Sequence, residues 1–217
     1  MKALVCGRGK SLKHFNVLEE DQYDFVYLVN DFNIFIRERP KLLRFLQNKS
    51  IKAKIIQQVN ICIAGVDNFL LNNLPISECF VSRCAHIPNS DHWVDDWADT
   101  KKFLRMGIPC PVKPHPPEVR PYIVNLDISN SLPFTIINAI VEKNCLEVDV
   151  IGQDFYEVNY AYGATEPDWE KNHSVPVQER LKKGIDRVCK EFSNTKFRIF
   201  TCSTYKSKTE NCKVVYL

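Results

Sequence analysis

Short apolar runs alternate with amphipathic segments along most of the chain. Strands are predicted at Lys2–Cys6, Phe25–Val29, Ala53–Gln58, Leu146–Ile151 and Phe197–Thr201, where runs of strand length end at glycine or polar residues. Helices are predicted at Ser11–Glu20, Arg37–Gln47, Phe134–Asn144 and Val177–Phe192, where apolar residues recur at helical spacing. Strand and helix therefore alternate along the chain.

This alternation predicts the fold class α/β: a Rossmann-like, mostly parallel sheet with helices on both faces, built as a single domain over 1–217. The middle segment 61–128 is less regular. A short strand is expected at Cys79–Ser82 and a helix at Asp95–Met106. From Pro109 to Pro121, six prolines indicate an extended connector, because proline disrupts helix interiors and central strands.

Three motifs stand at the carboxyl ends of predicted strands. Gly7-Arg8-Gly9 follows the first strand, Asn30 the second, and Gly152-Gln153-Asp154-Phe155-Tyr156 the strand near residue 150. Open α/β sheets bind ligands at these strand ends, so we expect one nucleotide-sized site built from all three. The glycines would let a phosphate approach the backbone at the start of the following helix. The turn matches neither the dinucleotide fingerprint nor the P-loop, so an ordinary strand-to-helix turn stays open.

Composition places the chain among ordinary globular proteins. Its net charge of +3 is too small to indicate nucleic-acid binding. The nine cysteines include no C-x-x-C pair, and Cys6, Cys62 and Cys145 lie in apolar runs as packing residues. With no signal peptide and no apolar stretch of membrane-spanning length, a cytoplasmic, soluble protein is expected.

Two charged segments have functional and ordinary interpretations. Arg37 to Lys54 is rich in basic residues and could associate weakly with an anionic membrane surface, although a solvated helix face is the favoured interpretation. His92, Asp95 and Asp99 could offer metal ligands, but a surface helix anchored by tryptophans is favoured, and no metal site is predicted.

His173 precedes Ser174, a candidate N-cap of the predicted helix over 177–192. The positive end of that helix disfavours the imidazolium form, so His173 could act as a base near neutral pH. An ordinary surface histidine is the alternative.

Taken in order, these motifs resemble the bacterial, Campylobacter-type sialyltransferase family. That family shares Gly-Asn-Gly-x-Ser-Leu-Lys near the N-terminus, an asparagine closing the second strand, Gly-x-Asp-Phe-Tyr, a Tyr-Ala pair and His-Ser before a C-terminal helix. The corresponding residues here are Gly7 to Lys13, Asn30, Gly152 to Tyr156, Tyr160-Ala161 and His173-Ser174, so the resemblance covers roughly 1–60 and 129–205.

The resemblance implies a Rossmann-like enzyme that uses CMP-sialic acid as donor and transfers the sugar to a glycan acceptor with inversion, without a metal or cofactor. His173 would be the general base, and Tyr156 with Tyr160 or Tyr162 would hydrogen-bond the departing phosphate. The donor would contact Gly7, Arg8, Gly9, Asn30, Asn60, Ser129, Ser131 and Gly152, with a lid loop over 157–172.

The chain departs from the family's pattern at several of these positions. Arg8 replaces an asparagine, Ser129-Asn130-Ser131-Leu132 replaces an Arg-x-Thr-Ser stretch, and Glu170 replaces a tyrosine. Two alternatives therefore remain: a related Mg²⁺-dependent pyrophosphokinase or nucleotide hydrolase, and a nucleotide-binding protein without catalysis.

Overall fold

The computed structural model describes residues 1–18, 23–29, 40–47, 51, 53–58, 74, 76–81, 112–113, 117–128, 131–158 and 175–217. Its strands are β1 (Lys2–Cys6), β2 (Phe25–Val29), β3 (Ala53–Gln58), β4 (Ile76–Val81), β5 (Val112–Lys113), β6 (Glu147–Ile151), β7 (Lys196–Thr201) and β8 (Cys212–Tyr216). Its helices are η1 (Lys10–Val17), α2 (Pro40–Leu46), α5 (Arg120–Asn125), α6 (Ser131–Val141) and α8 (Val175–Glu191).

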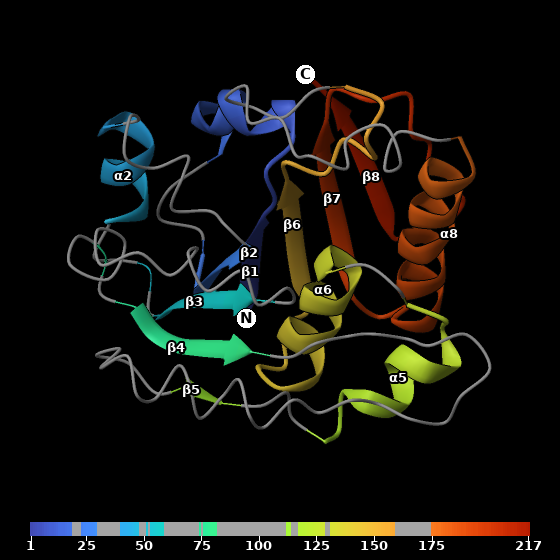
Figure 1. Ribbon diagram of the computed structural model, residues 1–217, viewed down its shortest axis with the longest axis horizontal. Coiled ribbons are helices and arrows are strands. Elements are labelled where there is room, and N and C mark those ends of the chain that lie inside the picture. Colours follow the sequence, from blue (N-terminus) through green and yellow to red (C-terminus); the bar gives the residue numbers. More distant parts are fainter. Residues whose placement is uncertain are drawn as a thin grey trace.

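The strands form one sheet in the order β5-β4-β3-β2-β1-β6-β7-β8, with every neighbouring pair parallel. From β1 the chain moves outward through β2 to β5, and it then returns to the other side of β1 with β6 (Figure 1). The strand order therefore reverses between β1 and β6, and the carboxyl ends of these two strands are where an open α/β sheet binds its ligand.

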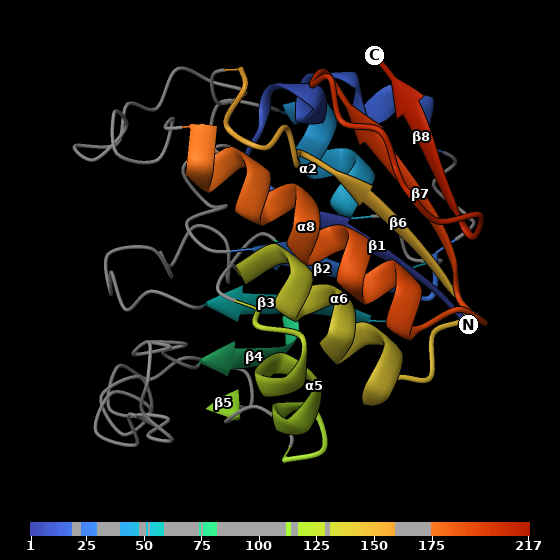
Figure 2. The same ribbon diagram turned by 90° about the vertical axis from the view of Figure 1, so that its right-hand side faces the viewer.

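Helices cover both faces of the sheet, which confirms the predicted fold class. One face packs residues such as Val5, Tyr27 and Val150 against α5, α6 and α8. The opposite face packs Leu4 and Leu28, among others, against η1 and α2. Figure 2 shows α5, α6 and α8 together in front of the sheet, with α2 behind it.

Strand β6 shows how alternation produces this sandwich. Val148 and Val150 face the α6/α8 core, whereas Ile151 faces the η1/α2 core, and all three are fully buried. A strand covered on both faces is apolar along most of its length. Asp149 is the polar exception, and it is buried on the same face as Ile151.

Several predicted boundaries were wrong. The segment expected as a helix over 11–20 is a 3₁₀ helix, Lys10–Val17, with non-helical backbone at His14. The helix expected from Phe134 to Asn144 instead spans Ser131–Val141. Its proline lies in the first turn, where no intrahelical N–H bond is lost.

Three elements were not predicted: β5, α5 and β8. The short strand β5 lies within the proline-rich connector and pairs with β4. The proline-rich connector was expected to stay extended to Pro121, but α5 begins at Arg120 with that proline in its first turn. Strand β8 lies parallel to β7 at the sheet edge. The predicted helix at 95–106 lies outside the described residues, and β4 begins three residues before the predicted strand at Cys79.

Candidate functional site

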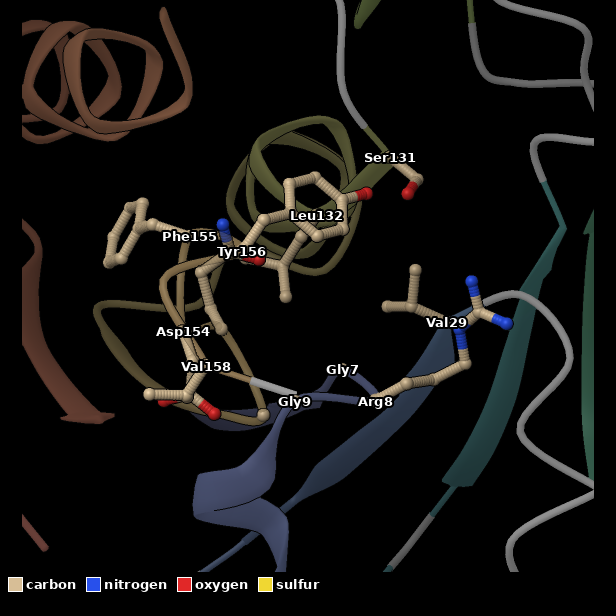
Figure 3. Close-up of a pocket in the computed structure, with 12 residues that line it drawn as sticks. Gly7, Arg8, Gly9, Val29, Ser131, Leu132, Asp154, Phe155, Tyr156 and Val158 are labelled. Atoms are coloured by element: carbon tan, nitrogen blue, oxygen red, sulfur yellow. The ribbon is translucent and has the colours of Figure 1, made fainter. Parts of the chain in front are cut away.

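A pocket of ≈ 50 Å³ lies at the carboxyl ends of β1 and β6, the point where the strand order reverses. Its lining residues come from the β1 turn, the end of β2, the start of α6 and the turn after β6 (Figure 3): Gly7, Arg8, Gly9, Val29, Ser131, Leu132, Gly152, Gln153, Asp154, Phe155, Tyr156 and Val158. Two of the three predicted strand-end motifs therefore meet at one site. The third, Asn30, lies outside the described residues.

The two glycine turns touch each other directly through their backbones. Gly7 N–H donates to the Ile151 carbonyl and Gly9 N–H donates to the Gly152 carbonyl, each at 2.7 Å. A Cβ on Gly9 would lie 2.5 Å from Asp154 Oδ2 and 2.8 Å from the Gly152 carbonyl oxygen. Glycine is required here because the two turns approach more closely than a side chain allows.

Gly152 has a second reason to be glycine. Its φ is +79°, a conformation that side-chain-bearing residues rarely adopt, and a Cβ there would collide with the Gly7 carbonyl. The Ser11 hydroxyl accepts a hydrogen bond from Gly152 N–H at 2.9 Å. The first residues of η1 thus hold the turn after β6 in place.

Asp154 joins three segments of the site. Its carboxylate is only 3% exposed and accepts Ser11 N–H at 2.7 Å, Cys202 N–H at 2.7 Å and the Thr201 hydroxyl at 2.8 Å. A buried carboxylate needs such donors because its desolvation is costly. Asp154 therefore ties the end of β6 to η1 and to the end of β7.

The predicted use of the η1 N-terminus needs a correction. We expected its N–H groups to meet a ligand phosphate, but Ser11 N–H donates to Asp154 and Leu12 N–H donates to the Gly9 carbonyl. The protein's own carboxylate occupies the position that an anion takes at a helix N-terminus. A bound phosphate would have to be met by other groups of the pocket.

A strained turn follows Asp154 and carries Tyr156 into the pocket. Glu157 N–H donates to the Asp154 carbonyl at 2.9 Å, and the central residues Phe155 and Tyr156 have φ values of 51° and 58°. Two consecutive positive φ values fit a type I′ turn, which usually contains Asn-Gly. Each such non-glycine residue costs roughly 1–3 kcal/mol, so surrounding contacts must maintain the turn.

Tyr156 and Arg8 lie on different sides of the pocket. Figure 3 shows the Tyr156 ring on the same side as Ser131 and Leu132 of α6, while the Arg8 side chain extends from the β1 turn alongside Val29. The pocket therefore combines a phenol, a hydroxyl and a guanidinium with backbone from two glycine turns. Phenols and guanidinium groups are suitable donors for phosphate oxygens.

The predicted site residues fall into two groups. The structure brings six of them together around the pocket: Gly7, Arg8, Gly9, Ser131, Gly152 and Tyr156. The other six lie outside the described residues: Asn30, Asn60, Ser129, Tyr160, Tyr162 and His173. Their roles therefore stay predictions.

Sequence reasoning missed the structural role of Asp154 and the contribution of Leu132. Asp154 stood in the quoted motif without a role, yet an acid directly after a buried strand was a usable signal. Leu132 stood in the stretch that replaces the family's Arg-x-Thr-Ser motif, also without a role, and its place in the pocket depends on α6 beginning at Ser131. Among the described residues, no group of three His, Cys, Asp or Glu side chains could hold a metal ion. The candidates His92, Asp95 and Asp99 are not among them.

Comparison with solved structures reveals the same fold in sialyltransferases. A variant of the sialyltransferase CST-II in complex with CMP superposes with a TM-score of 0.57 at 15% identity, covering 91% of this chain and 80% of that one. CST-II with a trisaccharide acceptor and CMP gives 0.55 at 16% identity, covering 92% and 80%. CstII from Campylobacter jejuni with the substrate analogue CMP-3FNeuAc gives 0.52 at 15% identity, covering 91% and 80%.

Comparison of the sequence itself finds no matching protein-family profile and no matching curated protein. The structural neighbours agree with the family that the motifs resemble, and they establish the fold. No helix in the described part of the chain is long and apolar enough to cross a membrane.

Proposed function

We propose that this chain is a sialyltransferase-like glycosyltransferase that moves a sugar from a CMP-activated donor to a glycan acceptor. The observation that carries the proposal is the pocket at the β1/β6 reversal, which unites Gly7, Arg8, Gly152 and Tyr156 in the fold of CMP-bound sialyltransferases. The sequence motifs and the structural neighbours support the same activity independently.

The donor would lie over the two glycine turns, with its phosphate between Arg8 and Tyr156. Charge grows on the CMP phosphate as its bond to the sugar breaks, so these groups would stabilise the transition state more than the bound donor. Ser131 is the first residue of α6, which turns the positive end of that helix toward the pocket. This helix could serve the phosphate in place of η1.

The remaining features of the proposed mechanism rest on the resemblance of the sequence motifs to the sialyltransferase family. His173 would remove the acceptor hydroxyl proton as that oxygen attacks the sugar, with inversion and without a metal ion. Sialic acid is the proposed sugar, with Asn30, Asn60 and Ser129 at the donor and Tyr160 or Tyr162 at the phosphate. A cytoplasmic location stays a prediction.

A panel of nucleotides tests the donor. CMP, CDP and CMP-sialic acid should raise the melting temperature more than UDP or GDP, because a ligand that binds only the folded state stabilises it. Stabilisation by GDP or ATP equal to that by CMP would overturn the cytidine assignment. Arg8→Ala should weaken CMP binding by about 1–3 kcal/mol, the usual cost of losing a charge-assisted hydrogen bond.

Turnover of CMP-sialic acid tests the reaction. His173→Ala should reduce transfer roughly 10²- to 10⁴-fold while leaving CMP affinity nearly unchanged, as expected for a lost general base. The matched control is His14→Ala, which removes an exposed histidine of η1 and should leave transfer unchanged. Activity abolished by EDTA and restored by Mg²⁺ would favour the nucleotide hydrolase. CMP binding without turnover of any CMP-sugar would favour the non-catalytic protein.

A further inference from the structure

Two carboxylates stand at the two ends of the strained turn that carries Tyr156. Asp154 is the first residue of the turn and Glu157 the fourth, and the Glu157 N–H closes the turn on the Asp154 carbonyl at 2.9 Å. The two central residues have left-handed backbone conformations. Phenylalanine and tyrosine rarely adopt this conformation, so contacts with the surrounding residues must stabilise it.

We propose that Asp154 and Glu157 act as a pair of positioning residues: their carboxylates hold the turn 154–157 in its left-handed conformation and so keep the Tyr156 ring in the pocket. That Tyr156 contacts a nucleotide phosphate rests on the proposed function. That the two carboxylates hold the turn rests on contacts alone.

Asp154 anchors the first end of the turn. Its two oxygens bind the N-terminus of η1 through Ser11 and the end of β7 through Thr201 and Cys202. The Thr201 hydroxyl also lies 3.0 Å from the Gln153 carbonyl oxygen. The first corner of the turn is thereby fixed to η1 and to the end of β7.

Glu157 anchors the other end. Its side chain is 14% exposed and lies 2.7 Å from Lys182 Nζ of α8. It also accepts Thr204 N–H at 2.6 Å and the Thr204 hydroxyl at 3.0 Å. These hydrogen bonds and Lys182 outweigh the effect of burial and lower the pKa of Glu157 below its ordinary value, so the carboxylate is ionised at neutral pH.

The two residues between the carboxylates make contacts of other kinds. Phe155 is buried and its ring packs 4.5 Å from that of Tyr205. The Tyr156 carbonyl accepts Gln178 Nε2–H at 3.3 Å. Figure 3 shows the consequence: the Phe155 ring points away from the pocket, and the Tyr156 ring lies along its wall. Two neighbouring aromatic rings are thus directed to opposite sides by one turn.

Amide hydrogen exchange tests whether the carboxylates hold the turn. In Glu157→Gln and in Thr201→Val, exchange at the position-157 amide should rise about 10-fold relative to amides of β6, because local opening becomes easier. Glu179→Gln is the control, since it removes the exposed partner of the same Lys182 and leaves the turn untouched. Unchanged protection at position 157 in both variants, or an equal rise in the control, would overturn the proposal.

A double-mutant cycle on CMP affinity tests the link to Tyr156. Glu157→Gln should weaken CMP binding about 3- to 10-fold in the parent chain but less than about 2-fold in Tyr156→Phe, because interacting residues are not additive. Additive losses would show that Glu157 does not act through Tyr156. A parent chain that does not bind CMP would overturn the proposed function, while hydrogen exchange would still decide whether the carboxylates hold the turn.

Discussion

Two equally buried aspartates, one within β6 and one just after it, are satisfied in different ways. Asp149, the middle residue of β6, is 2% exposed and binds two cations and a phenol: Arg198 Nε at 2.8 Å, Lys2 Nζ at 3.3 Å and the Tyr23 hydroxyl at 2.6 Å. Asp154, just beyond the carboxyl end, is 3% exposed and accepts from two backbone amides and a threonine hydroxyl. The aspartate within the strand is bound by cations and a phenol, and the aspartate beyond it is bound by neutral dipoles alone.

The groups that bind Asp149 differ in kind from those that bind Asp154 beside the candidate site. Hydrogen bonds with Asp149 raise the pKa of Arg198, and burial together with Asp149 raises the pKa of Tyr23, so both donors keep their protons. The negative charge of Asp149 is therefore neutralised locally by Arg198 and Lys2. At the carboxyl end the carboxylate organises backbone instead, and an arriving phosphate would meet Arg8, Tyr156 and the start of α6.

The largest effect is expected from a substitution in the turn after β6. Gly152→Ala should cost about 3 kcal/mol or more in free energy of unfolding, because it adds strain at a φ of +79° to a collision with the Gly7 backbone. Urea unfolding measures the loss, and CMP binding should disappear with it wherever the variant folds. An unfolding free energy within 1 kcal/mol of the parent would contradict the close contact of the two turns.

Breaking the ion pairs of Asp149 should give the opposite combination of results. Asp149→Asn should lower the free energy of unfolding by roughly 1–3 kcal/mol, less than for a fully buried ion pair, because the Arg198 side chain stays 39% exposed. CMP affinity should not change, since Asp149 does not line the pocket at the carboxyl end of β6. A large loss of CMP affinity in a folded Asp149→Asn protein would show that Asp149 and the pocket are coupled.

The strand and the turn after it also differ in how much the sequence reveals. Short apolar runs that end at glycine or polar residues predicted β1, β6 and β7, and the glycines at the ends of β1 and β6 predicted the place of the pocket. The sequence could not show that Asp154 takes the N–H of Ser11, 143 residues away, because backbone donors carry no residue signature. Long-range contacts of this kind depend on register and topology.

Local features of the sequence explain why β8 and α5 were not predicted. The strand β8 follows a link of polar residues, and its run of Lys213 to Tyr216 is too short to stand out. The Asn211 side-chain nitrogen lies within hydrogen-bond distance of the Cys189, Phe192 and Thr195 carbonyl oxygens, so one side chain caps the end of α8. Helix α5 was hidden by its neighbouring prolines, whose effect depends on their position in the first turn.

A glycine outside the site sharpens the contrast with Gly152. Gly184 lies within α8, where a Cβ would meet Pro133 Cγ at 3.8 Å and Ile128 Cδ1 at 3.9 Å, both ordinary contacts. Gly184→Ala should therefore stabilise the protein by about 0.5–1 kcal/mol, because alanine is the better helix former. Thermal unfolding measures it, and a destabilised Gly184→Ala would mean that α6 and α8 pack too closely for a methyl group.

The smallest expected effect is on the free energy of unfolding at acid pH. The folded-state pKa of Glu157 lies below its ordinary value of 4.5, so its charge contributes stability that is fully present above that pH and is lost as pH falls through the lower folded value. Glu157→Gln should cost roughly 0.5–1 kcal/mol at pH 7, the range of a partly exposed ion pair, and the difference from the parent should shrink at pH 3.

Urea unfolding of both proteins at the two pH values measures this convergence. Gly184→Ala serves as the comparison, because it changes no titratable group and its difference from the parent should be the same at both pH values. A Glu157→Gln deficit that grows as the solution is acidified would mean that the protonated carboxyl, and not its ion pair with Lys182, supports the turn that carries Tyr156.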